Sequence, residues 1–157
     1  MNYTTSRILV PHDASEMSDK ALNKAIEFAT ALKYEMIILH VIDDTLIPQG
    51  AIIGFISEKS TLEDAKTKLL KLFKIGAEVM LKDRLEKAEK NRINVRLIMG
   101  MGSPAEGIAD VAKNENVDLI IMGSKGVEKN NTSKLKLLGS VARRVSEIAE
   151  CAIMIIK

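Results

Sequence analysis

Apolar residues in this chain form short continuous runs, and longer segments with helical spacing lie between the runs. Short apolar runs are typical of parallel strands that are buried on both faces. They lie at residues 6–12, 35–42, 93–98, 117–122 and 151–156. In the intervening segments apolar side chains recur every three or four positions, which predicts amphipathic helices. These helices are expected at residues 15–33, 58–91, 104–114 and 139–150.

Strands that alternate with helices in this way predict a single α/β domain over residues 1–157. Parallel strands joined by right-handed helical crossovers form an open, doubly wound sheet with helices on both faces. A chain of 157 residues is long enough for one hydrophobic core and too short to suggest two. If the turns after the first and fourth strands form one site, those strands are neighbours. The five-stranded parallel sheet then has the order 3-2-1-4-5.

Three details of the helices can also be predicted. Ser15 is expected to cap the first helix, and Ser103 to cap the third, with Pro104 as its first residue. The longest helix is expected to bury one side, which consists of Leu62, Ala65, Leu69, Leu72, Phe73, Gly76, Val79, Met80 and Leu85.

The segment before the longest helix, 43–57, is unusually apolar for a connection. It either covers the edge of the core or faces a ligand or a second subunit.

The residues that follow the strands are the candidate ligand-binding residues, because open parallel sheets bind ligands at the carboxyl ends of their strands. Pro11-His12-Asp13 follows the first strand, and a stretch that begins with Gly123 follows the fourth and leads to the helix at Gly139-Ser140. Glycines let backbone N–H groups approach a ligand, and the first turn of a helix has unpaired N–H donors. Phosphate is therefore the expected ligand. The alternative is that the glycines only form the turn.

Composition excludes several other functions. The net charge is +2, with acidic and basic residues interspersed, so no nucleic-acid partner is expected. No apolar run is long enough to span a membrane, and the first residues lack the pattern of a leader peptide, so a cytoplasmic protein is expected. The single cysteine, Cys151, is expected to fill the core. The chain has no G-x-x-x-x-G-K-[ST] motif, and its first strand-to-helix turn has no glycine, which excludes a P-loop and a dinucleotide fingerprint.

Several short motifs are spread over the whole chain. They are ILVP at 8–11 with DAS at 13–15, LHV at 39–41, Gly102-x-Pro104, DLIIMGSKG at 118–126, GSV at 139–141 and the closing apolar strand. Together they resemble the universal stress protein family. In the ATP-binding members of that family, G-x-x-G is followed by nine residues and G-[ST]. Here Gly123 and Gly126 are followed by twelve residues, 127–138, and then by Gly139-Ser140.

The resemblance implies a site for ATP, which in the family can be accompanied by Mg or Mn. By resemblance, Asp13 would bond the ribose or approach a phosphate-bound metal, and the backbone of Val41 would meet the edge of the adenine. The glycines and Ser140 would surround the phosphates, and the lysine between the first two glycines is expected to contact one. A helix cap beside Ser15 is the alternative role for Asp13. The expected nucleotide-binding residues are Pro11, His12, Asp13, Val41, Met122, Gly123, Lys125, Gly126, Gly139, Ser140 and Val141.

The residues favour a binding protein over an enzyme. No nucleophile has an adjacent base, and no carboxylate pair is placed to activate water. His12 and His40 end neighbouring strands, but two ligands without a third favour packing or hydrogen bonding over a metal site. The favoured hypothesis is an ATP-binding, nucleotide-responsive module of the stress response. A slow ATP hydrolase and a nucleotide-free module that acts through protein partners are the alternatives, and the longer loop favours the second of them.

The last strand, Cys151–Ile156, predicts how the protein assembles. In the order 3-2-1-4-5 this strand lies at an edge of the sheet, and it is apolar with only Lys157 to guard it. An exposed apolar edge favours pairing with another chain. A homodimer through this strand is therefore expected, which is also the usual dimer of the family that the chain resembles.

Overall fold

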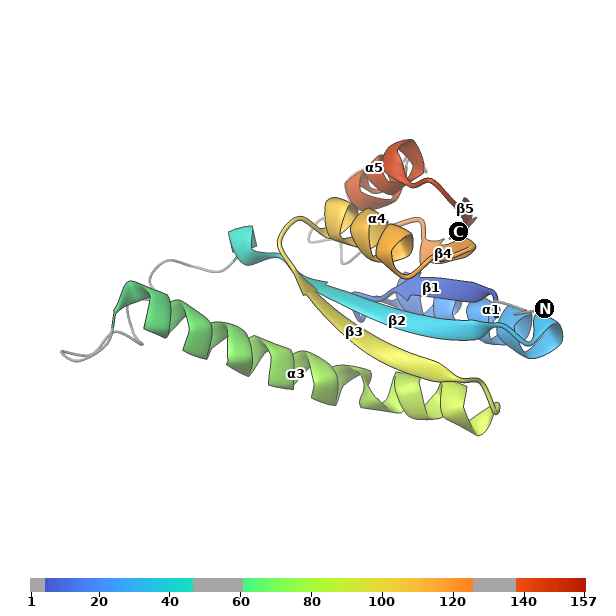
Figure 1. The fold of residues 1–157 in the computed structure, drawn as a ribbon, viewed down its shortest axis with the longest axis horizontal. Helices are drawn as coiled ribbons and strands as arrows, with labels where there is room; N and C mark the ends of the chain where they lie inside the picture. Colours follow the sequence, from blue (N-terminus) through green and yellow to red (C-terminus); the bar gives the residue numbers. More distant parts are fainter. Residues whose placement is uncertain (1–4, 47–60, 126–137) are drawn as a thin grey trace.

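The computed structural model describes residues 5–46, 61–125 and 138–157. Within them five parallel strands form one sheet in the order β3-β2-β1-β4-β5, which confirms the predicted topology (Figure 1). The strands are β1 (Arg7–Pro11), β2 (Glu35–Ile42), β3 (Val95–Met101), β4 (Leu119–Gly123) and β5 (Ala152–Ile156). The helices are α1 (Glu16–Leu32), α3 (Leu62–Lys90), α4 (Pro104–Asn114) and α5 (Ser140–Ile148), and a short 3-10 helix, η1 (Asp44–Leu46), follows β2. No helix of the described part is long and apolar enough to cross a bilayer.

Helices cover both faces of the sheet, as predicted. Successive residues of a strand point to opposite faces, so Ile8 and Val10 of β1 lie in one core cluster and Leu9 lies in the other. The first cluster is packed by α1 and α3, with Leu22 and Leu81 fully buried. The second is packed by α4 and α5, with members Ala105, Ile108, Ala112, Ala142 and Val145. Burial on both faces explains why the central strands are apolar without alternation.

β3 ends later than its sequence predicts. The strand was expected to end at Ile98 before a turn at Gly100, but β2 and β3 pair continuously from Met36↔Val95 to Ile42↔Met101. Gly100 pairs with Val41 within the ladder, because β2 is long enough to give it backbone partners. The turn lies at Gly102, whose φ of +114° suits glycine.

The exposed side of α3 also differs from the prediction. Its buried residues are Ala65, Leu69, Ala77, Leu81 and Ala88. Leu62, Leu72, Phe73 and Val79 were expected in the core but are 42–71% exposed. For Leu62, Leu72 and Phe73 the reason is length: the 29 residues of α3 span about 44 Å, whereas the 7 residues of β3 span about 23 Å. The first turns of α3 therefore extend past the carboxyl ends of the strands (Figure 1). Val79 lies in the later half of α3, where Ala77 and Leu81 are the buried residues.

Two helix N-termini have capping arrangements that bear on the site. Ser15 caps α1 as predicted, because its side chain accepts a hydrogen bond from the backbone N–H of Ser18. Ser103 is the N-cap residue of α4 and Pro104 is its first residue, as predicted, but the side chain of Ser103 makes no cap bond. Its hydroxyl instead donates to the carboxylate of Glu106. Glu106 lies in the first turn of α4, where a carboxylate balances the positive end of the helix.

Candidate functional site

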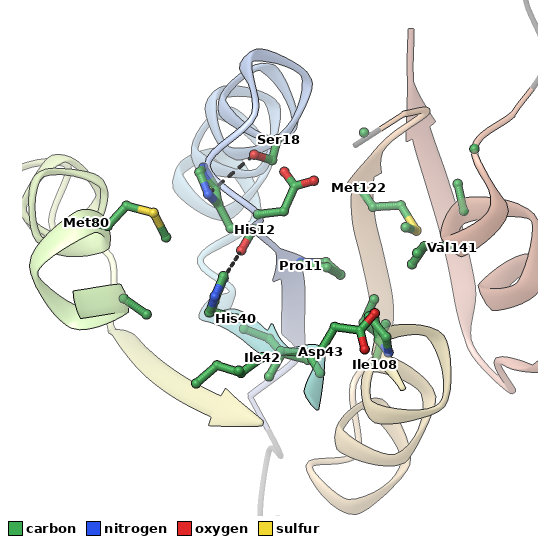
Figure 2. A pocket seen from close by; sticks show the side chains of 18 of the residues that line it. Pro11, His12, Ser18, His40, Ile42, Asp43, Met80, Ile108, Met122 and Val141 are labelled. Carbon is green, nitrogen blue, oxygen red and sulfur yellow. Dashed lines mark hydrogen bonds between the residues drawn. The ribbon is translucent and has the colours of Figure 1, made fainter. Parts of the chain in front are cut away.

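A cavity of about 1130 Å³ lies at the carboxyl ends of β1, β2 and β4 (Figure 2). The first turn of α5, part of α4 and the middle of α3 complete its wall. The predicted site residues that the structure describes all line it, and these are Pro11, His12, Asp13, Val41, Met122, Gly123, Lys125, Gly139, Ser140 and Val141. Gly126 and residues 47–57 of the apolar connection lie outside the described residues. The adjacency of β1 and β4 that such a site requires is present, with Ile8 paired to Leu119.

The two ends of the glycine-motif segment meet at the cavity. The N–H of Gly139 donates to the carbonyl of Ser124 over 2.8 Å, and the N–H of Ser124 donates to the carbonyl of Ile156 over the same distance. The end of β4 and the start of α5 are thus joined directly to each other and to β5. The convergence of Gly123 with Gly139-Ser140 is fixed by these bonds, whatever the length of the chain between them.

The N-terminus of α5 has donors that face the cavity wall without an intrahelical acceptor. The first helical bond runs from the N–H of Arg143 to the carbonyl of Gly139. The N–H groups of Ser140, Val141 and Ala142 lie before this bond and have no acceptor within the helix. Gly139, the N-cap residue, offers no side-chain cap, and no acidic residue lies in the first turn. In the described part of the chain, α1 and α4 begin at the same cavity, but Ser15 accepts from the N–H of Ser18 in α1, and Glu106 places a carboxylate in the first turn of α4. α5 therefore has the N-terminus most suited to an anionic ligand.

The turn after β1 is held in an uncommon backbone conformation. Ala14 has φ of 64°, in the left-handed region, which costs a residue other than glycine roughly 1–3 kcal/mol. Two bonds stabilise it: Ala14 N–H donates to His12 Nδ1 over 3.1 Å, and Ser15 N–H donates to Asp13 Oδ1 over 3.0 Å. Asp13 thus stabilises the turn through the N–H of Ser15, the residue that caps α1, and it also lines the cavity.

The buried His12 side chain lies at the centre of a hydrogen-bond network. This side chain is 0% exposed, and its Nε2 lies 3.0 Å from Asp19 Oδ1. Because Nδ1 accepts from Ala14, the hydrogen is on Nε2 and the ring is neutral. Burial lowers the pKa of His12, although Asp19 opposes that shift. Arg84 of α3 holds Asp19 through bonds of 3.0 and 3.1 Å, and its hydrogen bond lowers the pKa of Asp19.

His40 has one ring nitrogen engaged by the same segment. Its Nδ1 lies 2.8 Å from the carbonyl oxygen of His12, as the dashed line in Figure 2 shows, so Nδ1 carries a hydrogen and donates it to that oxygen. Both ring nitrogens of His12 are already bonded within the protein. The two imidazoles are therefore tied to each other through the backbone, an arrangement that favours the hydrogen-bonding role over a shared metal.

Gly123 is a strand residue that packs against α1. A β-carbon added there would lie 2.9 Å from Cβ of Met17 and 3.0 Å from its carbonyl carbon. Real side chains essentially never pack so closely, so only glycine lets the end of β4 approach α1. The sequence predicted a phosphate-contacting glycine at this position, and the geometry adds a packing role that the sequence did not predict.

Sequence reasoning missed one wall of the cavity. Leu69, Leu72, Phe73, Gly76, Ala77 and Met80 of α3 line it, as do Ser18 and Ser124. The one signal was Gly76, a glycine in the interior of a long helix, where it costs about 1 kcal/mol relative to alanine. Nothing lies within 4 Å of the position that a β-carbon on Gly76 would take.

Comparisons with known proteins agree over the whole chain. The model of the universal stress protein family matches residues 4–157. Universal stress protein YxiE of Bacillus subtilis is 31% identical, over 97% of this chain and 99% of that protein. Universal stress protein MJ0577 of Methanocaldococcus jannaschii is 30% identical, over 100% of this chain and 98% of that protein.

Solved structures share the fold. The structure of MJ0577 is similar with a TM-score of 0.80 at 30% identity, over 97% of this chain and 95% of that chain. The structure of a universal stress protein from Archaeoglobus fulgidus in complex with dAMP has a TM-score of 0.62 at 17% identity, over 98% of both chains. Because the family model matches residues 4–157 and two universal stress proteins are 30–31% identical over nearly the whole chain, this chain belongs to the universal stress protein family.

Proposed function

We propose that this protein is a nucleotide-responsive binding module that holds ATP in the cavity at the carboxyl ends of β1, β2 and β4. The observation that carries the proposal is the N-terminus of α5, whose first turn lines the cavity with three N–H groups that have no intrahelical acceptor. Oriented backbone donors and the positive end of a helix suit phosphate oxygens. Lys125 also lines this part of the wall, so a cation lies on the side where the phosphates would bind.

The rest of the cavity suits a nucleoside. Asp13 would accept hydrogen bonds from the ribose, and the backbone at Val41, at the end of β2, would meet the adenine edge. Pro11, Ile108 and Met122 give that region an apolar wall (Figure 2). The dAMP complex of the Archaeoglobus fulgidus protein supports the proposal at the level of the fold, because it gives an example of an adenine nucleotide on this architecture.

The proposal is of binding without efficient catalysis. A general base needs a free acceptor near the reacting group, and both ring nitrogens of His12 are engaged within the protein. No group of three possible His, Cys, Asp or Glu metal ligands occurs in the described residues. Mg or Mn would therefore enter with the nucleotide and be held chiefly by phosphate oxygens, with Asp13 as a nearby carboxylate, and it would neutralise phosphate charge. A slow hydrolase is the enzymatic alternative, and phosphate release would measure it.

Calorimetry with ATP and a charge variant of α5 tests the proposal. Ser140→Glu puts a carboxylate at the first helical position, where it repels phosphate and competes for the same donors. We expect it to abolish ATP binding while it stabilises the helix by about 0.3–1 kcal/mol. The matched control is Ser146→Glu, which adds the same charge to an exposed position in the last turn of α5, where Ser146 bonds the carbonyl of Arg143. That control should bind ATP like the wild type.

Two results would contradict the proposal. If the wild type gives no heat with millimolar ATP in the presence or absence of Mg, the nucleotide-free alternative is correct. If Ser140→Glu binds as tightly as Ser146→Glu, the nucleotide does not place its phosphates at α5.

The proposal also includes a homodimer through β5, because this apolar strand is paired on one side by β4 and lies at the sheet edge on the other.

A further inference from the structure

We infer that His12 is a positioning residue, which holds the Asp13 turn in the conformation that the ligand requires and links that turn to α3. The inference rests on the proposed function, because Asp13 matters only if the cavity binds a ligand with donors for its carboxylate. The side chain of His12 is 0% exposed and bonds to Asp19, which Arg84 holds in turn.

The first step is the acceptor that His12 gives to the turn. Ala14 adopts the left-handed conformation with φ of 64°, and its N–H would have no partner in that conformation without His12 Nδ1 at 3.1 Å. The hydroxyl of Ser18 lies 3.4 Å from Nδ1 but donates its hydrogen to the carbonyl of Ser15 over 2.8 Å. Nδ1 therefore acts as the acceptor for the Ala14 N–H alone. Losing this acceptor frees Ala14 to relax, and Asp13 moves with it.

The second step is how the ring is held. Nε2 donates to Asp19 on α1 over 3.0 Å, and the guanidinium of Arg84 on α3 binds both oxygens of Asp19. Arg84 also donates to the carbonyl of Met80 over 2.9 Å, and Met80 lines the cavity. The orientation of the imidazole thus depends on two helices. Movement of α3 at the cavity wall would be transmitted to Asp13 through Arg84, Asp19 and His12.

Two substitutions of His12 separate the two contacts of its ring. In His12→Asn the side-chain oxygen can take the place of Nδ1 and accept from Ala14, but the shorter side chain does not reach Asp19. In His12→Gln the amide reaches Asp19 and leaves Ala14 N–H without its acceptor. Each variant loses one hydrogen bond, so the two should lose similar stability. Only the second should disturb Asp13.

Calorimetry with ATP and amide exchange of Ala14, followed by NMR, give the readout. We expect His12→Asn to bind ATP within threefold of the wild type and His12→Gln to bind about tenfold more weakly. Exchange of the Ala14 amide should be slow in the wild type and His12→Asn and fast in His12→Gln. Ala14→Gly should restore affinity in the His12→Gln background, because glycine adopts the left-handed conformation without support.

The outcomes distinguish this inference from the proposed function. If the wild type does not bind ATP, the proposed function fails and the inference fails with it. If the wild type binds but both His12 variants lose affinity in proportion to their stability, His12 is only structural and the inference is overturned. It is also overturned if the Ala14 amide becomes unprotected in His12→Gln while ATP affinity stays unchanged, because the turn then does not govern the site.

Discussion

Gly123→Ala tests the packing of β4 against α1. The added β-carbon would lie 2.9 Å from Cβ of Met17, 3.0 Å from its carbonyl carbon and 3.1 Å from its carbonyl oxygen. Two of these three atoms belong to backbone within the first turns of α1, so they cannot rotate away as a side chain would. Either α1 or the end of β4 must shift, and both of them line the cavity through Ser18 and Met122.

The expected loss of stability follows from two opposing effects. Crowding of a packed interior by one added group costs about 1–3 kcal/mol. Alanine loses less backbone entropy than glycine on folding, which offsets about 0.5–1 kcal/mol. The net loss in the free energy of unfolding is therefore about 1–2 kcal/mol, and a chain of this size should unfold about 5 °C lower.

Urea unfolding, followed by circular dichroism, measures this effect against two matched glycine variants. At Gly107 the new β-carbon would lie 3.3 and 3.4 Å from the two Cγ atoms of Val41, a side chain that can adjust, so Gly107→Ala should be close to neutral. At Gly76 nothing lies within 4 Å, so Gly76→Ala should stabilise the protein by about 1 kcal/mol through helix propensity. If Gly123→Ala were as stable as the wild type, close packing would not be the reason for glycine at this position.

Two further predictions concern pH and assembly. Burial lowers the pKa of His12 below 6.5, so unfolding takes up a proton in the pH range between the lowered pKa and 6.5, where Asp19 stays ionised. The free energy of unfolding should therefore fall as the pH drops through this range. In urea unfolding, His12→Asn should flatten this part of the pH profile. The carbonyl of Ile156 faces β4, so the N–H of Ile155 faces the open edge of the sheet. If the protein forms the proposed dimer through β5, Ile155→Pro should give a monomer in light scattering and Ile155→Val should not; a dimer that survives Ile155→Pro uses another surface.

The sheet could be predicted because its strands are buried on both faces. Burial leaves continuous apolar runs, and requiring one site from the ends of β1 and β4 led to the correct strand order. The residues around the cavity could be located for the same reason, since they follow those strands. What they bind stays a prediction.

The features that the sequence did not reveal depend on interactions between elements that are distant in the sequence. The packing role of Gly123 depends on Met17, which no local pattern connects to it. The extension of β3 to Met101 depends on the length of β2. The predicted side of α3 included Leu72 and Phe73 because periodicity gives the apolar face of a helix but not how much of that face the sheet reaches. The hydrogen bonds from His12 through Asp19 to Arg84 link the turn after β1 to α1 and α3, and no sequence motif marks them.

Because Gly139 is bonded to Ser124, the geometry of the site does not depend on the number of residues between them, which matters for evolution and for engineering. Because a hydrogen bond of 2.8 Å joins the two ends of this segment, residues can be added between them without displacing β4 or α5. Growth of a flexible loop from nine to twelve residues costs only about 0.3 kcal/mol in closure entropy. Descendants of one ancestral gene can therefore acquire insertions at this point almost neutrally. For the same reason, it is the position of choice for grafting a peptide tag or a sensor sequence that reports on the cavity.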